Sequence, residues 1–256
     1  MGSRDKVTLW IPLSHIKKLL LGLGLLGVLW GIAVYEVPAK NALNYWNLPL
    51  AGVTIALDAG HGGPDGGAVS RQGLIEKDIN LAVALYLRDY LQQAGAIVVM
   101  TREDDRDLAD EGTKGYSKRK TEDLKRRVRF IEEKQAKLLI SIHMNSVPSS
   151  RWSGAQTFFT SANEKSYDLA YLIQEELIRN LENSDRVAKR NDKTVYLLEA
   201  LKIPSALVEV GFLSHPGEAA MLGNEQYQRK VAASIYQGIL RYSSGETGKR
   251  ANESGE

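Results

Sequence analysis

Short apolar runs alternate with longer amphipathic segments over most of the chain. The runs are short, apolar and bounded by turn residues, so they predict strands: residues 53–57, 96–100, 138–142, 154–160 and 206–210. The segments repeat apolar residues at helical spacing and predict helices: residues 79–91, 122–135, 169–181 and 227–239. Apolar strands separated by helices predict an α/β fold whose sheet is largely buried and covered by helices on both faces.

The N-terminal pattern differs from the rest. Residues 19–35 contain no charge and would span about 26 Å as a helix, close to a bilayer core of about 30 Å. Four basic residues precede the run and only Lys40 follows it closely, which places the N-terminus in the cytoplasm and residues 40–256 outside. Residues 37–39 could serve as a cleavage site, so a signal peptide competes with a permanent anchor, and a buried core helix is the third alternative.

These features predict an organisation in five parts. A basic cytoplasmic N-terminus covers residues 1–18, and the anchor or signal peptide covers residues 19–35. A tether, a single catalytic domain and a flexible tail rich in Gly, Ser and Glu follow, and we place them at residues 36–51, 52–243 and 244–256.

Composition narrows the chemistry. Lys and Arg number 33 against 31 Asp and Glu, so the chain has no field that would attract nucleic acid. The absence of cysteine excludes disulfides, thiolate metal sites, iron–sulfur clusters and cysteine nucleophiles. Any histidine chemistry must use the four histidines: His15, His61, His143 and His215.

Candidate chemistry gathers where strands end, which is where functional residues collect in α/β sheets. His61 follows the first strand and His143 the third, while Glu76 precedes a helix and Glu209 lies within a late strand. Two histidines and a carboxylate at one rim predict a zinc site, since catalytic zinc takes three protein ligands and keeps a fourth position for water. The residues could instead be structural: Glu76 as a helix N-terminal acid and Glu209 as a paired carboxylate. The glycine-rich loop at 60–73 matches no nucleotide-binding motif.

Six segments resemble the zinc-dependent N-acetylmuramoyl-L-alanine amidases that cut bacterial peptidoglycan. They occur in that family's order over roughly residues 53–242: LDAGHGGPDGGA, GLIEKDINL, VVMTREDD, LLISIHMNS, WSGAQTFF and IPSALVEVGFLSHPGE. The resemblance implies a mixed, mostly parallel sheet. It also implies that His61, Glu76 and His143 bind Zn²⁺ and that Glu209 is the catalytic glutamate.

A further segment, DLADEGTKGYSKRKTEDLKRR, resembles the germination-specific amidases of endospore-forming bacteria. That resemblance implies action on spore cortex peptidoglycan, where removal of stem peptides precedes formation of muramic lactam. It also implies an extracytoplasmic location in the spore envelope, attached to the membrane or secreted. Some such amidases need a lipoprotein partner, and the sequence does not say whether this one does.

The implied mechanism is hydrolysis without a covalent intermediate. Zinc would polarise the scissile carbonyl and lower the pKa of bound water towards about 7, and Glu209 would act as general base and then general acid. We predict substrate contacts at Gly62, Gly63, Asn145 and Arg102, although Arg102 could instead order the loop that follows it.

Two positions depart from the family pattern. Ala59 stands where a proline is usual, which frees one backbone angle and leaves His61 in place. His215 stands where an asparagine is usual, and because Pro216 follows it we expect a loop or helix entry there rather than a third histidine ligand.

Charged clusters and alternative functions stay open at this point. The basic run at 118–129 could be a solvated helix face, could attract anionic stems or a partner, or could pair with the acidic loop at 103–111.

The chain could also be a non-catalytic wall-binding or scaffold protein on the same fold, or a different metallohydrolase such as a peptidoglycan deacetylase. Reaction products separate these alternatives, because an amidase releases peptides with a free N-terminal alanine and a deacetylase releases acetate.

Overall fold

The computed structural model describes residues 12–34, 48–191 and 195–249. The chain divides into two units, residues 1–47 and 48–256. In the first unit, helix α1 (Leu13–Val34) is long and apolar enough to cross a membrane. Its 22 residues correspond to about 33 Å, the thickness of a bilayer core. The helix begins six residues before the uncharged run. The proposed cleavage site and residues 36–47 of the predicted tether lie outside the described residues, and residues 48–51 belong to the second unit, where Leu50 is buried.

The second unit is built on one six-stranded sheet in the order β2-β1-β3-β6-β4-β5. The strands are β1 (Thr54–Ala59), β2 (Ile97–Met100), β3 (Leu138–Asn145), β4 (Gln156–Phe159), β5 (Lys189–Arg190) and β6 (Ser205–Phe212). Strands β2, β1, β3 and β6 are parallel, whereas β4 runs antiparallel to β6. The mixed, mostly parallel sheet is therefore confirmed.

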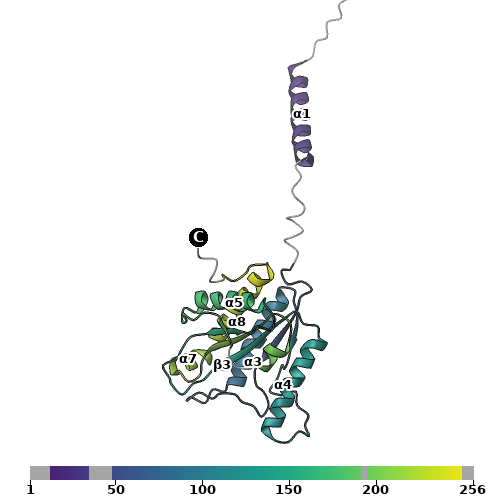
Figure 1. The fold of residues 1–256 in the computed structure, drawn as a ribbon. Coiled ribbons are helices and arrows are strands. Elements are labelled where there is room, and N and C mark those ends of the chain that lie inside the picture. Colours follow the sequence, from purple (N-terminus) through teal and green to yellow (C-terminus); the bar gives the residue numbers. More distant parts are fainter. Residues whose placement is uncertain (1–11, 35–47, 192–194, 250–256) are drawn as a thin grey trace, which may run out of the picture. The chain divides into compact units, whose positions relative to one another are not determined.

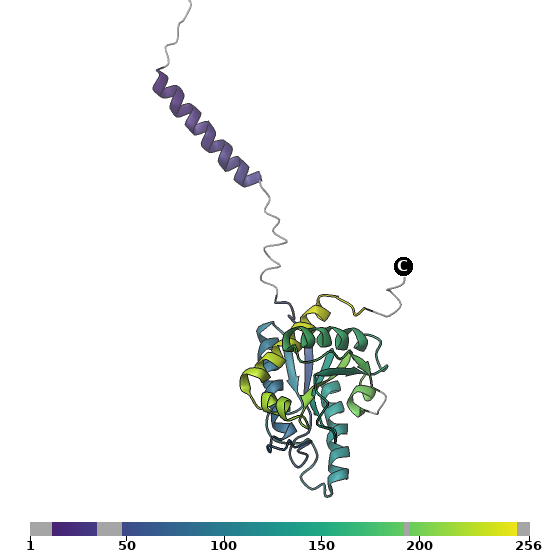
Figure 2. The same ribbon diagram turned by 90° about the vertical axis from the view of Figure 1, so that its left-hand side faces the viewer.

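Helices cover both faces of this sheet. On one face lie α3 (Glu76–Gln93), α5 (Ser166–Leu181) and α8 (Glu225–Ser243), and on the other lie α4 (Tyr116–Glu133) and α6 (Tyr196–Ala200) (Figure 1; Figure 2). Side chains of a strand point alternately to the two faces, so β1, β2, β3, β4 and β6 each contribute to both cores. The buried apolar side chains on the α3 face of the sheet and those on the α4 face form two separate clusters.

Some elements differ from the sequence-based expectation. Helix α4 begins six residues earlier than predicted, because residues 116–121 carry no apolar repeat. The short elements α6 and β5 were not predicted, and for α7 (Pro216–Leu222) only a loop or helix entry at Pro216 was expected. Elements of two to seven residues are too short to show a hydrophobic period.

The C-terminal segment is attached to the domain further than we expected. The side chain of Glu246 pairs with Arg241, and the backbone N–H of Gly248 donates to Asp168 at 3.0 Å. The hydroxyl group of Tyr167 donates to the carbonyl of Lys249 at 2.6 Å. The segment 244–249 therefore packs on α5, and residues 250–256 lie outside the described part of the chain.

Candidate metal centre

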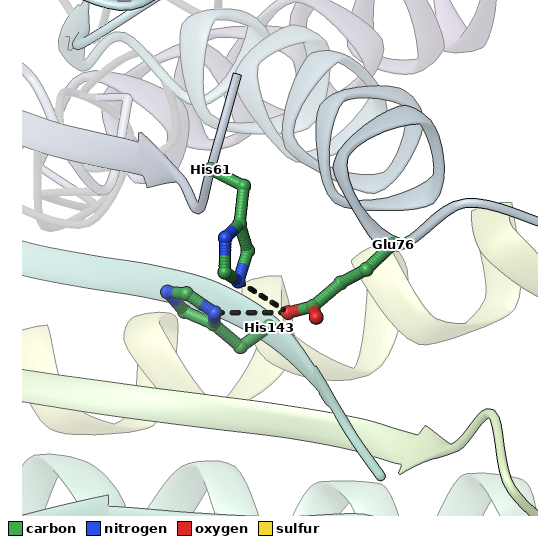
Figure 3. Close-up of side chains that lie close together, drawn as sticks. All are labelled: His61, Glu76 and His143. Atoms are coloured by element: carbon green, nitrogen blue, oxygen red, sulfur yellow. Dashed lines mark hydrogen bonds and ion pairs between the residues drawn. The ribbon is translucent and has the colours of Figure 1, made fainter. Parts of the chain in front are cut away.

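Two histidines and a glutamate from three elements converge at the carboxyl edge of the sheet. His61 follows β1, Glu76 is the first residue of α3, and His143 lies near the end of β3. The Oε1 atom of Glu76 lies 3.1 Å from Nε2 of His61 and 3.0 Å from Nδ1 of His143 (Figure 3). One potential ligand atom from each side chain lies within 4.8 Å of the others. The structure thus brings together the three residues that the sequence suggested as ligands.

The donor atoms and their spacing fit a metal ion. Two imidazole nitrogens and a carboxylate oxygen form a ligand set typical of zinc. Ligand atoms around a tetrahedral zinc ion with bonds of about 2.0–2.1 Å lie roughly 3.3 Å apart. The observed separations of 3.0 and 3.1 Å are close to that value. Three protein ligands would leave a position for water or substrate.

Glu76 is buried and held in place by backbone donors. Its Oε2 atom accepts from the N–H of Ala68 at 2.8 Å, and its Oε1 atom accepts from the N–H of Met144 at 3.1 Å. Burial alone would raise the pKa of Glu76, but hydrogen bonds and charge from the two histidines outweigh it and hold this pKa well below its usual range. The carboxylate is therefore ionised and fixed at the head of α3.

His61 is presented by a turn of unusual backbone geometry. Its φ angle is 64°, in the left-handed region that few non-glycine residues adopt. Its Nδ1 atom lies 2.9 Å from Oδ2 of Asp65, which leaves Nε2 facing Glu76. Burial alone would lower the pKa of His61. Hydrogen bonds and charge from Asp65 and Glu76 outweigh this effect and raise the pKa to about 9. The two carboxylates therefore favour positive charge at this position, as a cation site requires.

Two buried arginines hold the backbone of this turn. Both Arg102 and Arg127 are 1% exposed. Arg102 donates to the carbonyls of Ala59 and Gly60 at 2.8 and 3.0 Å. Arg127 donates to the carbonyls of Ala59 and His61 at 3.1 and 2.6 Å. Three consecutive carbonyls are thus fixed by guanidinium groups, which offsets the strain of the turn.

Asp58 on β1 connects the buried Arg127 to the strands of the sheet. Its carboxylate accepts from Arg127 at 2.7 Å, from the Thr101 hydroxyl at 2.8 Å and from the Ser141 hydroxyl at 2.6 Å. Burial alone would raise the pKa of Asp58, but Arg127, the charge of His143 and the hydroxyl bond lower it to about 2. Strands β1, β2 and β3 and helix α4 therefore share one buried polar network beneath the site.

Glycines let the loop approach the ligands. A Cβ atom on Gly60 would lie 2.3 Å from the ring of His143. A Cβ atom on Gly67, whose φ is +70°, would lie 2.5 Å from Oε2 of Glu76. Neither position has room for a larger side chain unless a ligand moves.

Glu209 lies beside this cluster on the neighbouring strand. It is the register partner of His143 across β3 and β6, so the two side chains share one face of the sheet. Its Oε2 atom is buried and has no hydrogen-bond partner in the described part of the chain. Burial and the charge of Glu76 raise the pKa of Glu209 to about 7 against the opposing effect of the two histidines. A carboxyl group with this pKa can accept and release a proton near neutral pH.

Gly62, Gly63, Asn145 and Arg102 lie around the site, and the backbone N–H groups of the two glycines are already engaged. The N–H of Gly62 donates to Asp65 at 2.9 Å, and the N–H of Gly63 donates to the carboxylate of Asp105 at 2.9 Å. Asn145 pairs with Phe212 at the end of β3 and is partly buried. Of the two roles open for Arg102, its bonds to backbone carbonyls describe loop ordering, and it offers almost no surface to a substrate.

Sequence reasoning missed the residues that support the ligands. Asp65 lies in the glycine-rich loop four residues after His61, and this spacing was the available signal. Arg127 belongs to the basic run that we expected to be a solvated helix face, to attract anionic stems or a partner, or to pair with the acidic loop at 103–111. It is buried, and it pairs with Asp58 and Asp123, which lie outside that loop. Its neighbours Arg119 and Arg126 pair with Asp107 and Asp110, as the ion-pairing alternative predicts.

His215 takes no part in the cluster. It is the N-cap of α7, and its Nδ1 atom accepts from the N–H of Glu218 at 3.1 Å. Of the loop or helix entry expected at Pro216, the structure shows the helix entry.

Comparisons with known proteins agree with this geometry. A family model described as N-acetylmuramoyl-L-alanine amidase matches residues 55–241. The chain is 55% identical over 208 residues to the germination-specific N-acetylmuramoyl-L-alanine amidase of Bacillus subtilis, covering 81% of this chain and 87% of that relative. It is 43% identical to the CwlD amidase of Clostridioides difficile, solved in complex with the GerS lipoprotein, with a TM-score of 0.73 over 76% of this chain and 100% of that one. The catalytic domain of CwlV, an N-acetylmuramoyl-L-alanine amidase of Paenibacillus polymyxa, is 32% identical, with a TM-score of 0.64 over 76% of this chain and 99% of that one.

Proposed function

Because the chain belongs to the N-acetylmuramoyl-L-alanine amidase family, we propose that it is a zinc-dependent enzyme that removes stem peptides from spore cortex peptidoglycan. The bond cleaved is the amide between the lactyl carbonyl of N-acetylmuramic acid and L-alanine. The observation that carries the proposal is the convergence of His61, Glu76 and His143 beside Glu209, whose Oε2 atom has no hydrogen-bond partner among the described residues.

Zinc held by His61, Glu76 and His143 would polarise the scissile carbonyl and lower the pKa of water. The carboxylate of Glu209 would accept a proton from the water that attacks the carbonyl carbon. It would then deliver that proton to the nitrogen of L-alanine, which leaves as a free amine. Asp65 would fix the ring orientation of His61 through Nδ1, as the outer partners of metal-binding histidines do.

Similarity to known amidases supports spore cortex peptidoglycan as the substrate. The germination-specific amidase of Bacillus subtilis is 55% identical over most of both chains. The Clostridioides difficile amidase was solved with a lipoprotein, which supports a partner of that kind for this chain too. Helix α1 supports a location outside the cytoplasm, with the helix acting as a signal sequence or a membrane anchor. Removal of the stem peptide would prepare muramic acid for formation of the muramic lactam.

Mass spectrometry of digested walls tests the proposal. Purified protein with zinc should release peptides with a free N-terminal alanine from spore cortex, and faster than from vegetative wall. A chelator should abolish the release and added Zn²⁺ should restore it. Released acetate would identify a deacetylase instead, and binding to the wall without any product would identify a non-catalytic wall protein.

A further inference from the structure

Arg186 carries a charge at the edge of the site that the mechanism above does not use. It lies between α5 and β5, and its guanidinium lies 5.0 Å from the ring centre of Phe212 and 5.6 Å from that of Trp152. Its Nε atom donates to the carbonyl of Ser153 at 2.9 Å, and its Nη1 atom donates to Oε1 of Gln156 at 3.1 Å. Two rings and two hydrogen bonds therefore fix the orientation of the guanidinium.

The residues that hold Arg186 are neighbours of the catalytic group. Gln156 is the antiparallel register partner of Glu209, and Glu209 is the partner of His143. Directly paired residues on adjacent strands point to the same face, so these three side chains form one row across β3, β6 and β4. Phe212 ends β6 and pairs with Asn145 at the end of β3. Arg186 thus lies beside the row that contains the metal ligand and the base.

The guanidinium retains free donors. Within the described residues no Asp or Glu forms an ion pair with Arg186, and its Nη2 atom donates no hydrogen bond. Its neighbours Trp152 and Val187 are 55% and 70% exposed, so a solute can reach this edge of the site. A fixed guanidinium with free N–H groups matches the planar, two-oxygen geometry of a carboxylate.

We propose that Arg186 binds a free carboxylate of the stem peptide, on the second residue from the scissile amide. Arg186 lies in the segment before β5 and bonds to Gln156 on β4, the register partner of Glu209, so roughly one to two strand spacings, about 5–10 Å, separate its guanidinium from Glu209. The second residue of an extended peptide lies about 7 Å from the scissile carbonyl. This assignment rests on the proposed amidase function, since it names a contact within the same substrate.

Two matched substrates test the assignment. The full-length protein is assayed on disaccharide peptides that are identical except that the α-carboxyl group of the second residue is free or amidated. The protein should prefer the free carboxylate by roughly tenfold or more in kcat/KM, through a lower KM, because hydrogen bonds between charged groups contribute about that much. In Arg186→Met the preference should fall towards one. Arg190→Met, which removes an exposed arginine from the same sheet edge, should keep it.

The outcomes are distinguishable. Arg186→Lys keeps the charge without the planar fork, and it should show an intermediate preference for the free carboxylate. Equal loss on both substrates in Arg186→Met would show that Arg186 only stabilises the fold, and this result would overturn the proposal. So would an unmodified protein that does not distinguish the two substrates. If the unmodified protein cleaves neither substrate at the alanine amide, the amidase function itself fails and the contact with it.

Discussion

At the residue scale, the surroundings of Glu76 and Glu209 shift the pKa values of these two glutamates in opposite directions. Glu76 accepts backbone hydrogen bonds and faces two histidines, so its pKa lies well below the usual range. The Oε2 atom of Glu209 is buried without a hydrogen-bond partner among the described residues, and desolvation of the carboxyl group raises its pKa to about 7. Pairs of carboxyl groups with pKa values pushed apart by their surroundings identify separate roles. Glu76 suits a permanent ligand and Glu209 suits a group that moves protons.

Replacement of Glu209 by glutamine tests this division of roles. Glu209→Gln preserves shape and removes the proton acceptor, so kcat should fall by about 10²–10⁴. Zinc content and thermal stability should stay close to those of the unmodified protein, because Glu209 is outside the ligand set. Both are measured on the same preparation by elemental analysis and calorimetry. Near-normal hydrolysis with zinc bound would refute the role of Glu209.

At the element scale, the glycine-rich loop is shaped by its contact with Glu76. Gly67 and Gly73 both have positive φ angles, of +70° and +85°. A Cβ atom on Gly67 would strike the Glu76 carboxylate, whereas one on Gly73 meets nothing within 4 Å. An alanine would therefore be strained at both positions, and only at Gly67 would its Cβ atom also strike metal-site side chains, those of Glu76 and His61.

This contrast supplies a matched pair of variants. Gly67→Ala and Gly73→Ala should each lower the free energy of unfolding by about 1–2 kcal/mol through the left-handed backbone. Only Gly67→Ala should also weaken zinc binding, by about tenfold or more, because it displaces Glu76. Zinc affinity is measured by competition with a chromophoric chelator. Equal zinc affinity in the two variants would show that the loop does not position Glu76.

The buried side chain of Arg127 joins helix α4 to the turn that carries His61. Arg127 bonds to Asp123 on its own helix and to Asp58 on β1, whereas its neighbour Arg126 forms its ion pairs at the surface. Arg127→Met leaves two buried carboxylates without their partner and should cost about 3–5 kcal/mol of unfolding free energy. Arg126→Met should cost less than about 1 kcal/mol. Urea denaturation of both variants measures the difference, and similar losses would contradict this account.

The same elements show how far sequence reasoning extends. Strand ends predicted His61, His143 and Glu209, because carboxyl ends of parallel strands meet at one edge of a sheet. The burial of Arg127 could not be predicted, since it lies within a basic run whose other members face solvent or pair with acids. The antiparallel direction of β4 could not be derived either, because direction depends on packing and not on the apolar pattern of one strand. The contact between Asp65 and His61 depends on a glycine turn that has no sequence period.

At the scale of the whole molecule, the site rests on buried charge. Asp58, Asp123, Arg102 and Arg127 are all buried beneath the turn that carries His61. Charged groups removed from water are costly unless they are paired and hydrogen-bonded. Here every one of them is bonded to another member or to a backbone group. The position of the turn that carries His61 therefore depends on these buried groups staying ionised.

That coupling predicts how stability depends on acid pH. The pKa of Asp58 falls from 3.8 to about 2 on folding, so between these values the unfolded chain binds more protons than the folded one. The contribution of Asp58, about 2 kcal/mol, is complete above this window and is lost as the pH falls through it. In urea titrations with chelator present, Asp58→Asn should be less stable than the unmodified protein by about this amount or more at pH 7. The difference should shrink as the pH approaches 2. A difference that stays constant across this range would mean that Asp58 stabilises the fold by shape and not by charge.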